Sequence, residues 1–135
     1  MGTERTASDS RITVLCVDDS PEIVAALRAL IDREADLIAV GGVHDAAQFI
    51  DVARALKPRI AVVDVSMPGE TTPMQAIRRV SDEVPETRVI AYSGYDDAGT
   101  QDLVMEAGAW ELVSKHAELR VLIDAVRRVA SVESA

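Results

Sequence analysis

The chain has 135 residues, of which 48% are hydrophobic, and this is enough for one domain with a substantial core. Its formal net charge of −9 argues against direct nucleic-acid binding, which needs a basic surface, and no apolar run approaches the roughly 18 residues of a membrane span. The N-terminus lacks the apolar core of a signal peptide, and a single cysteine, Cys16, excludes an internal disulfide, so we expect a cytoplasmic protein without a membrane partner.

The chain begins with small polar residues, and we expect a flexible tail over residues 1–10. An apolar run at residues 12–17 predicts the first strand. Ser20 and Pro21 are typical of a helix start, which predicts a helix over residues 22–34. Apolar residues recur along this helix with the 3.6-residue period and predict its buried face: Ile23, Ala26, Leu27, Leu30 and Ile31.

The rest of the chain alternates between short apolar runs and amphipathic segments. The apolar runs predict strands at residues 37–43, 59–64, 88–92 and 110–114. The amphipathic segments predict helices at residues 45–56, 97–107 and 118–132, and one more from the loop at 66–73 to about residue 83. The helix at 45–56 is predicted to bury Ala46, Phe49, Ile50 and Ala53.

Five strand–helix units in succession predict an α/β fold. The strands are nearly continuous runs of Val, Ile, Leu and Ala, as expected for a parallel sheet whose two faces are both covered by helices. Short right-handed crossovers then favour a flavodoxin-like (βα)5 doubly wound parallel sheet with strand order 2-1-3-4-5.

Charged residues follow three of the predicted strands at the point where each strand ends. Asp18 and Asp19 follow the first strand, Asp64 closes the third, and Lys115 follows the fifth. The carboxyl ends of parallel strands meet at one edge of the sheet, where ligands bind, so we expect these side chains to share one pocket. Three carboxylates and one ammonium match the chemistry of a divalent cation and a phosphoryl group.

Four segments together resemble the receiver domain of bacterial two-component response regulators. The segments stand in the expected order. Three of them lie at the ends of predicted strands, and the fourth leads through the fifth strand to Lys115. The resemblance covers residues 11–131, leaving 132–135 as a C-terminal tail. The segments are Val17-Asp18-Asp19-Ser20-Pro21, Val63-Asp64-Val65-Ser66-Met67-Pro68-Gly69, Ser93-Gly94 and Ala107-Gly108-Ala109.

The resemblance implies that Asp64 accepts a phosphoryl group as an aspartyl-phosphate. It also implies a Mg²⁺ site formed by Asp19, Asp64 and the backbone carbonyl of Ser66, with Asp18 acting through water. The alternative for these acids is a purely structural one, in which they cap a turn or favour the helix dipole.

Lys115 and Ser93 resemble the receiver residues that contact phosphoryl oxygens. The chain departs from the receiver pattern at Leu112, where an aromatic residue usually couples phosphorylation to the outer face. The resemblance further implies that the face formed by the fourth helix, fifth strand and fifth helix contacts a second copy or a target protein. Trp110 lies on this face as either a packing residue or a contact residue.

We therefore expect a protein phosphorylated by a sensor histidine kinase or a histidine phosphotransfer protein. It would be a single-domain response regulator, a phosphorelay shuttle, or the receiver of a helix-turn-helix transcription regulator, and it would catalyse only its own phosphorylation and dephosphorylation. The alternative is a pseudo-receiver adaptor that binds proteins without being phosphorylated. A flavin enzyme is disfavoured because Asp18 and Asp19 would repel a flavin phosphate.

Overall fold

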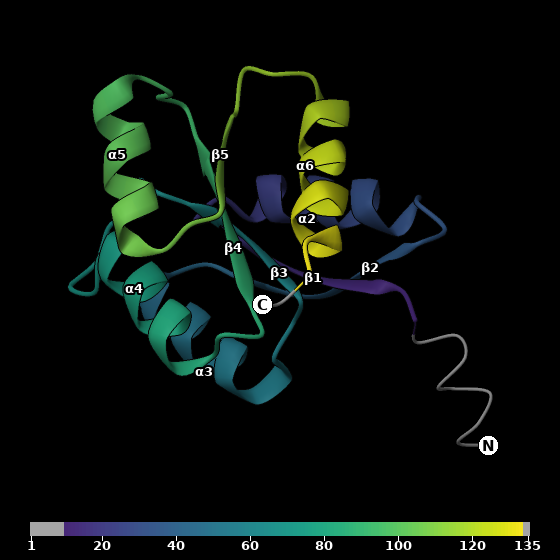
Figure 1. Ribbon diagram of the computed structural model, residues 1–135, viewed down its shortest axis with the longest axis horizontal. Helices are drawn as coiled ribbons and strands as arrows, with labels where there is room; N and C mark the ends of the chain where they lie inside the picture. The colour runs from purple at the N-terminus through teal and green to yellow at the C-terminus, as the bar shows by residue number, and fades with distance from the viewer. Residues whose placement is uncertain (1–9, 134–135) are drawn as a thin grey trace.

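The five apolar runs of the sequence pair into one parallel sheet with the order β2-β1-β3-β4-β5 (Figure 1). The computed structural model describes residues 10–133. The strands are β1 (Ile12–Val17), β2 (Leu37–Val43), β3 (Ile60–Asp64), β4 (Arg88–Ser93) and β5 (Glu111–Ser114). The predicted flavodoxin-like fold and its strand order are confirmed.

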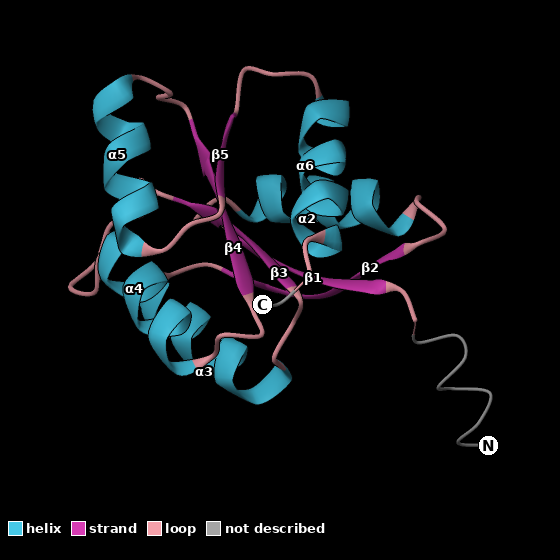
Figure 2. Cartoon of the chain, viewed as in Figure 1, coloured by secondary structure: helices cyan, strands magenta, loops and turns pink. Residues whose placement is uncertain are grey.

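Helices α3, α4 and α5 cover one face of the sheet, and α2 and α6 cover the other (Figures 1 and 2). The helices are α2 (Pro21–Asp32), α3 (Ala46–Leu56), α4 (Pro73–Glu83), α5 (Ala98–Ala107) and α6 (Leu119–Ser131). None of these described helices has the length and apolar character needed to cross a bilayer. The predicted N-terminal tail lies outside the described residues except for Ser10, as do the last two residues of the predicted C-terminal tail.

Side-chain caps set where the helices begin. Ser20 accepts a hydrogen bond from the N–H of Ile23 at 3.3 Å, directly before Pro21, which favours the first turn. Asp45 and Asp97, predicted as the first helical residues, are instead the N-caps of α3 and α5. Each cap satisfies a backbone N–H that has no partner within its helix, so the helix starts one residue later than periodicity alone indicates.

The buried face of α2 is rotated from the predicted one. Val24, Leu27 and Ile31 are buried, whereas Ala26 is exposed, so the prediction for Ala26 was wrong. Helix α2 lies against β2, and a side chain at Gly42 of that strand would collide with Val24. The absence of a Cβ at Gly42 lets Val24 approach the sheet closely, a contact that helical periodicity does not encode.

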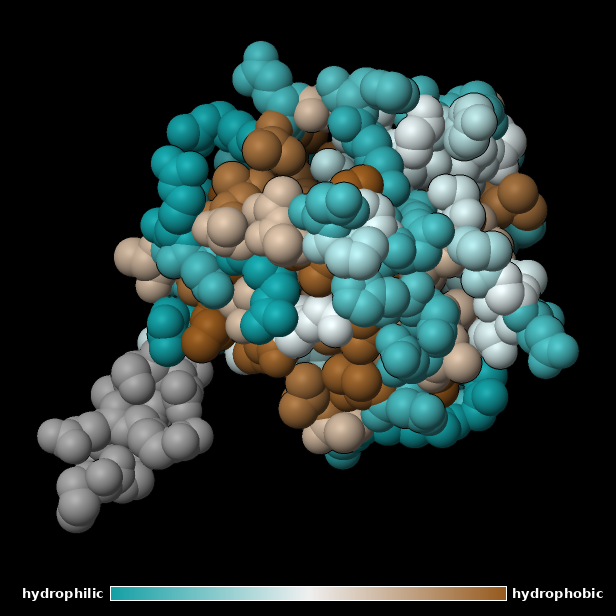
Figure 3. Space-filling view, turned by 180° about the vertical axis from the view of Figure 1, so that it is seen from behind, coloured by the Kyte–Doolittle hydropathy of each residue, from teal (hydrophilic) through white to brown (hydrophobic). Residues whose placement is uncertain are grey.

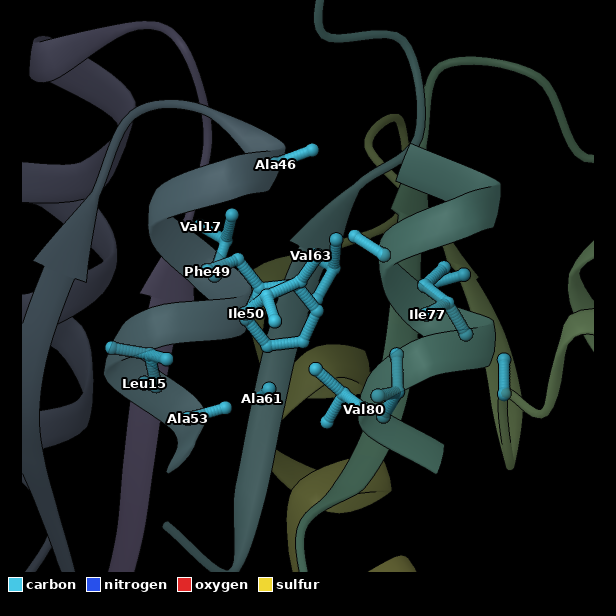
Figure 4. Close-up of a cluster of buried hydrophobic side chains, with 14 of the residues drawn as sticks. Leu15, Val17, Ala46, Phe49, Ile50, Ala53, Ala61, Val63, Ile77 and Val80 are labelled. Carbon is cyan, nitrogen blue, oxygen red and sulfur yellow. The ribbon is translucent and has the colours of Figure 1, made fainter. Parts of the chain in front are cut away.

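The core between the sheet and α3–α5 is built around Phe49 (Figure 4), the only phenylalanine of the chain. All four predicted inward residues of α3 are buried. The side chain of Phe49 lies among residues of β1, β3 and α4, which include Leu15, Val17, Ala61, Val63, Ile77 and Val80. This packing fixes β1 and β3 side by side, and their carboxyl ends carry the acidic residues.

Candidate functional site

Three strands bring charged side chains together at the carboxyl edge of the sheet. Asp18 follows β1 directly, Asp64 is the last residue of β3, and Lys115 follows β5. The ammonium of Lys115 lies 2.8 Å from Oδ2 of Asp18 and 3.4 Å from Oδ1 of Asp64. Both carboxylates are buried, while the lysine side chain is 22% exposed. A buried pair of acids is therefore balanced by one cation that still reaches solvent.

Strand alternation explains why these three side chains lie on the same side of the sheet. In each strand, the residue two positions earlier packs into the core under α2 and α6, and these residues are Cys16, Val62 and Val113. The sheet ladder extends past the strand ends, because Asp18 N–H donates to Val43 and Lys115 N–H donates to Ser93. The side chains at the ends therefore keep the alternation of their strands.

Asp19 adds a third carboxylate at the solvent side of the site. Oxygens of Asp18, Asp19 and Asp64 lie within 4.8 Å of one another. Partial burial, together with the negative charges of Asp64 and Asp18, raises the pKa of Asp19. The three acids thus repel one another unless a cation joins them. Carboxylate oxygens are the donors that Mg²⁺ prefers, and Mg²⁺ keeps several waters, so these residues fit that ion.

Ser66 orients the carboxylate of Asp64. Its backbone N–H donates to Oδ1 of Asp64 at 3.1 Å, and its hydroxyl donates to the same oxygen at 3.0 Å. Lys115 also approaches Oδ1, so three donors converge on one oxygen of the carboxylate. Oδ2 takes none of these three contacts. The two oxygens of Asp64 therefore have different surroundings, which gives the carboxylate a defined orientation.

The protonation state of Lys115 is set by two opposed effects. Partial burial disfavours the charged form, but the hydrogen bond to Asp18 and the charges of Asp64 and Asp18 outweigh it and raise the pKa of Lys115. The lysine is therefore charged at neutral pH. Its ammonium also lies 5.6 Å from the centroid of the Tyr92 ring.

Ser93 ends β4, which lies between the strands that lead to Asp64 and Lys115, and Leu112 lies within β5. Ser93 is the buried last residue of β4, and its hydroxyl accepts a hydrogen bond from the N–H of Tyr95 at 2.9 Å. Leu112 packs against the core under α3–α5. Asp64 pairs with Tyr92 in the sheet, and Ser93 is the next residue of β4. The structure thus places Ser93 at the same sheet edge as Asp64.

Two residues at the site were not predicted to act there. His44 follows β2, and its Nδ1 donates to the backbone carbonyl of Asp18 at 3.1 Å. Tyr92 precedes Ser93 and faces Lys115. The signal for His44 was its place at a strand end beside β1. Tyr92 lies inside an apolar run, where no local signal distinguishes it from a core residue.

Trp110 is a partly exposed residue just before β5. The guanidinium of Arg88 lies 4.2 Å from the centroid of its indole ring, a cation–π contact. Arg88 also donates to the carbonyl of Val129 at the end of α6. Trp110 therefore packs on a side chain tied to α6 and still offers part of its ring to solvent.

The family model of the response regulator receiver domain matches residues 14–127 of the chain. The chain belongs to this family. The match includes the three acids of the site and Lys115. Membership in this family assigns the chain to two-component signalling.

Individual relatives agree with the receiver assignment. The chain is 31% identical over 91% of its length to a protein-glutamate methylesterase/protein-glutamine glutaminase of Desulfitobacterium hafniense, and covers 34% of that protein. The response regulator domain of Thermotoga maritima CheB superposes with a TM-score of 0.83 at 27% identity, covering 92% of this chain and 99% of that one. The signal receiver domain of NarL from Mycobacterium tuberculosis superposes with a TM-score of 0.84 at 25% identity, covering 92% of this chain and 99% of that one.

The chain spans between about a third and somewhat over half of the length of these curated relatives. The chain covers 34%, 55% and 57% of the length of three curated proteins that it matches. The activities named for those longer proteins are therefore not assigned to this chain.

Proposed function

We propose that this receiver accepts a phosphoryl group on Asp64 from the phosphohistidine of a sensor kinase or of a histidine phosphotransfer protein. The observation that carries the proposal is the position of the Lys115 ammonium, 2.8 Å from Asp18 and 3.4 Å from Asp64, beside three carboxylates within 4.8 Å of one another. A cation fixed between buried acids is suited to phosphoryl transfer, which depends mainly on positioning and charge neutralisation.

The contacts of Asp64 assign a role to each of its oxygens. Ser66 and Lys115 hold Oδ1, so Oδ2 is the nucleophile. Oδ2 forms a bond to phosphorus while the N–P bond of the phosphohistidine breaks, and the electron pair of that bond remains on the imidazole nitrogen. Lys115 then neutralises charge on an equatorial phosphoryl oxygen, and the hydroxyl of Ser93 hydrogen-bonds another.

Three carboxylates face one ammonium at the site, which leaves a net negative charge that repels an incoming phosphoryl group. Asp19, Asp64 and the Ser66 carbonyl would hold Mg²⁺ directly, and Asp18 would act through water. The bound ion would supply the missing positive charge and orient phosphoryl oxygens. Desolvation raises the pKa of Asp19, and the charges of Asp64 and Asp18 raise it further, which accords with this excess of negative charge.

The receiver comprises residues 11–131 in this proposal, and its chemistry is confined to its own phosphorylation and dephosphorylation. It acts in the cytoplasm as a single-domain regulator, as a phosphorelay shuttle, or as the input part of a helix-turn-helix regulator. The lengths of the relatives are compatible with the last form.

The output surface in this proposal comprises α5, β5 and α6, which contact a second copy or a target protein. Large apolar side chains are exposed on and beside these elements, namely Leu103, Met105, Trp110, Leu119 and Val121. Apolar side chains also reach the surface on the side turned away from the viewer of Figure 1, as the view from behind shows (Figure 3), so exposed apolar groups are not confined to α5, β5 and α6. Exposed apolar groups of this kind often mark contact sites.

Acetyl phosphate with Mg²⁺ provides the test, because it donates a phosphoryl group without a kinase. We expect mass spectrometry to detect one added phosphoryl group on the parent and none on Asp64→Asn, since an amide is a far weaker nucleophile. Asp51→Asn, which changes an exposed aspartate of α3, is the matched control and should be modified like the parent. A parent that is never modified would instead support the pseudo-receiver adaptor, and modification of Asp64→Asn would place the acceptor elsewhere.

A further inference from the structure

The side chain of Lys115 must cross β4 to reach the acids. Lys115 follows β5, whereas Asp64 ends β3, and β4 lies between these two strands. The β4 residue paired with Asp64 is Tyr92, and the same residue pairs with Val113 on β5. Tyr92 belongs to the core under α2 and α6, on the side to which Lys115 and Asp64 also project. The lysine therefore extends over the tyrosine ring.

The contact between the ring and the ammonium is partly shielded from water. Nζ of Lys115 lies 5.6 Å from the ring centroid, within the range of a cation–π interaction. Tyr92 is only 6% exposed, and the lysine side chain 22% exposed. Such interactions gain strength as water is removed from the pair.

The surroundings of the ring give the ammonium no other partner on that side. Tyr92 and Lys115 line a pocket of about 240 Å³ whose other walls are the apolar side chains of Ile23, Ala26, Leu27 and Leu119. An ammonium displaced into this pocket would lose Asp18, and the hydroxyl of Tyr92 is the one side-chain acceptor in its lining.

We propose that Tyr92 is a positioning residue for phosphoryl binding, whose ring holds the Lys115 ammonium against Asp18 and Asp64. This inference rests on the proposed acceptor function of Asp64. The ring acts through the lysine and touches no reacting atom. Leu112 cannot serve this purpose, because it packs on the opposite side of the sheet.

The test compares variants that keep or remove the ring. Tyr92→Leu replaces it with an apolar side chain, and Tyr92→Phe keeps it without the hydroxyl. Tyr95→Leu is the matched control, since Tyr95 is the only other tyrosine and is 70% exposed. The probe is beryllofluoride with Mg²⁺, a mimic of the phosphoryl group, and its dissociation constant is measured by calorimetry.

We expect Tyr92→Leu to raise the dissociation constant of beryllofluoride about three- to tenfold, which matches the strength of a partly desolvated cation–π contact. The dissociation constants of Tyr92→Phe and Tyr95→Leu should stay within about twofold of the parent value, because both variants keep an aromatic ring at position 92. A purely structural role would lower the melting temperature of Tyr92→Leu but leave the dissociation constant of beryllofluoride unchanged. Equal affinity of Tyr92→Leu and parent would overturn the inference, whereas a parent that neither binds beryllofluoride nor accepts a phosphoryl group would overturn the proposed function itself.

A second measurement, made on the parent protein, tests the inference even if Tyr92→Leu does not fold. The chain has two lysines, Lys57 and Lys115, so their ε-methylene signals are readily assigned by NMR. We expect nuclear Overhauser contacts between the Lys115 ε-protons and the Tyr92 ring, and none from the exposed Lys57. Their absence from Lys115 as well would refute the positioning role.

Discussion

The ammonium of Lys115 and the buried carboxylate of Asp18 form an ion pair at 2.8 Å across 97 positions of sequence. The pair joins the end of β1 to the end of β5, and Asp64 lies beside it. Because both acids are buried, the lysine is the cation that keeps their charges tolerable in the folded protein. The same three side chains thus contribute to stability and to phosphoryl chemistry. Substitutions at the site should therefore change both the unfolding free energy and the response to phosphorylation.

Removing the exposed acid should stabilise the metal-free protein. In Asp19→Asn, the repulsion from Asp64 and Asp18 that raises the pKa of Asp19 is lost, and the gain in unfolding free energy should be roughly 0.5 kcal/mol after solvent screening. Calorimetry should show weaker Mg²⁺ binding by the same variant. Thermal melts with and without Mg²⁺ check both effects, and an undiminished Mg²⁺ affinity would mean that Asp19 is not a ligand.

Lys115→Ala should still bind Mg²⁺ but should respond poorly to phosphorylation. The variant leaves Asp18 and Asp64 without their cation, so unfolding without Mg²⁺ should become about 1–3 kcal/mol easier. Lys115→Arg should not fully restore the response, because a planar guanidinium differs from a compact ammonium. Lys57→Ala, at an exposed lysine, is the control for both measurements.

The phospho-dependent change is read by comparing NMR spectra with and without beryllofluoride. A Lys115→Ala spectrum that changes as fully as that of the parent or of Lys57→Ala would exclude this lysine from the response. Chemical denaturation supplies the accompanying free energies.

The ion pair between Arg127 of α6 and Asp36 should make the unfolding free energy depend on pH in the acidic range. The hydrogen bond from Arg127 lowers the pKa of Asp36, so the folded protein holds this proton less tightly than the unfolded chain. The pair therefore contributes stability above the ordinary pKa of an aspartate, and this contribution is lost as pH falls through the lowered value.

Arg127→Gln should thus be slightly less stable than the parent at neutral pH, because the pair is exposed and water screens its attraction. The difference should shrink as the solution is acidified through the range in which Asp36 takes up its proton. Urea denaturation at several pH values measures it. A difference that stays constant with pH would assign the effect of Arg127 to packing and not to its ion pairs.

Phe49→Ala should be the most destabilising of these changes, by about 3–5 kcal/mol, since it leaves a cavity in a fully buried site. Phe49→Leu should cost less because it fills most of the volume. Leu56→Ala, half exposed at the end of the same helix, should have only a small effect. Denaturant unfolding compares the three, and a loss at Phe49 no larger than that at Leu56 would contradict the packing.

The sequence alone was sufficient to predict the architecture, because the signals are local. The apolar run of β3 and the period of α3 each report on a few neighbouring residues, and parallel topology follows from their alternation. Local signals also placed Asp18, Asp64 and Lys115 at the ends of strands. Their meeting at one edge of the sheet then followed from the fold class.

Only the tertiary structure decided which side chains touch. The approach of Val24 to Gly42 depends on how α2 lies against β2, and this rotated the buried face away from Ala26. The contact of Tyr92 with Lys115 exists because β4 lies between β3 and β5, and because alternation turns both side chains to the same side. Such contacts join residues distant in sequence, and their geometry is set by the packing of whole elements, which no local period records.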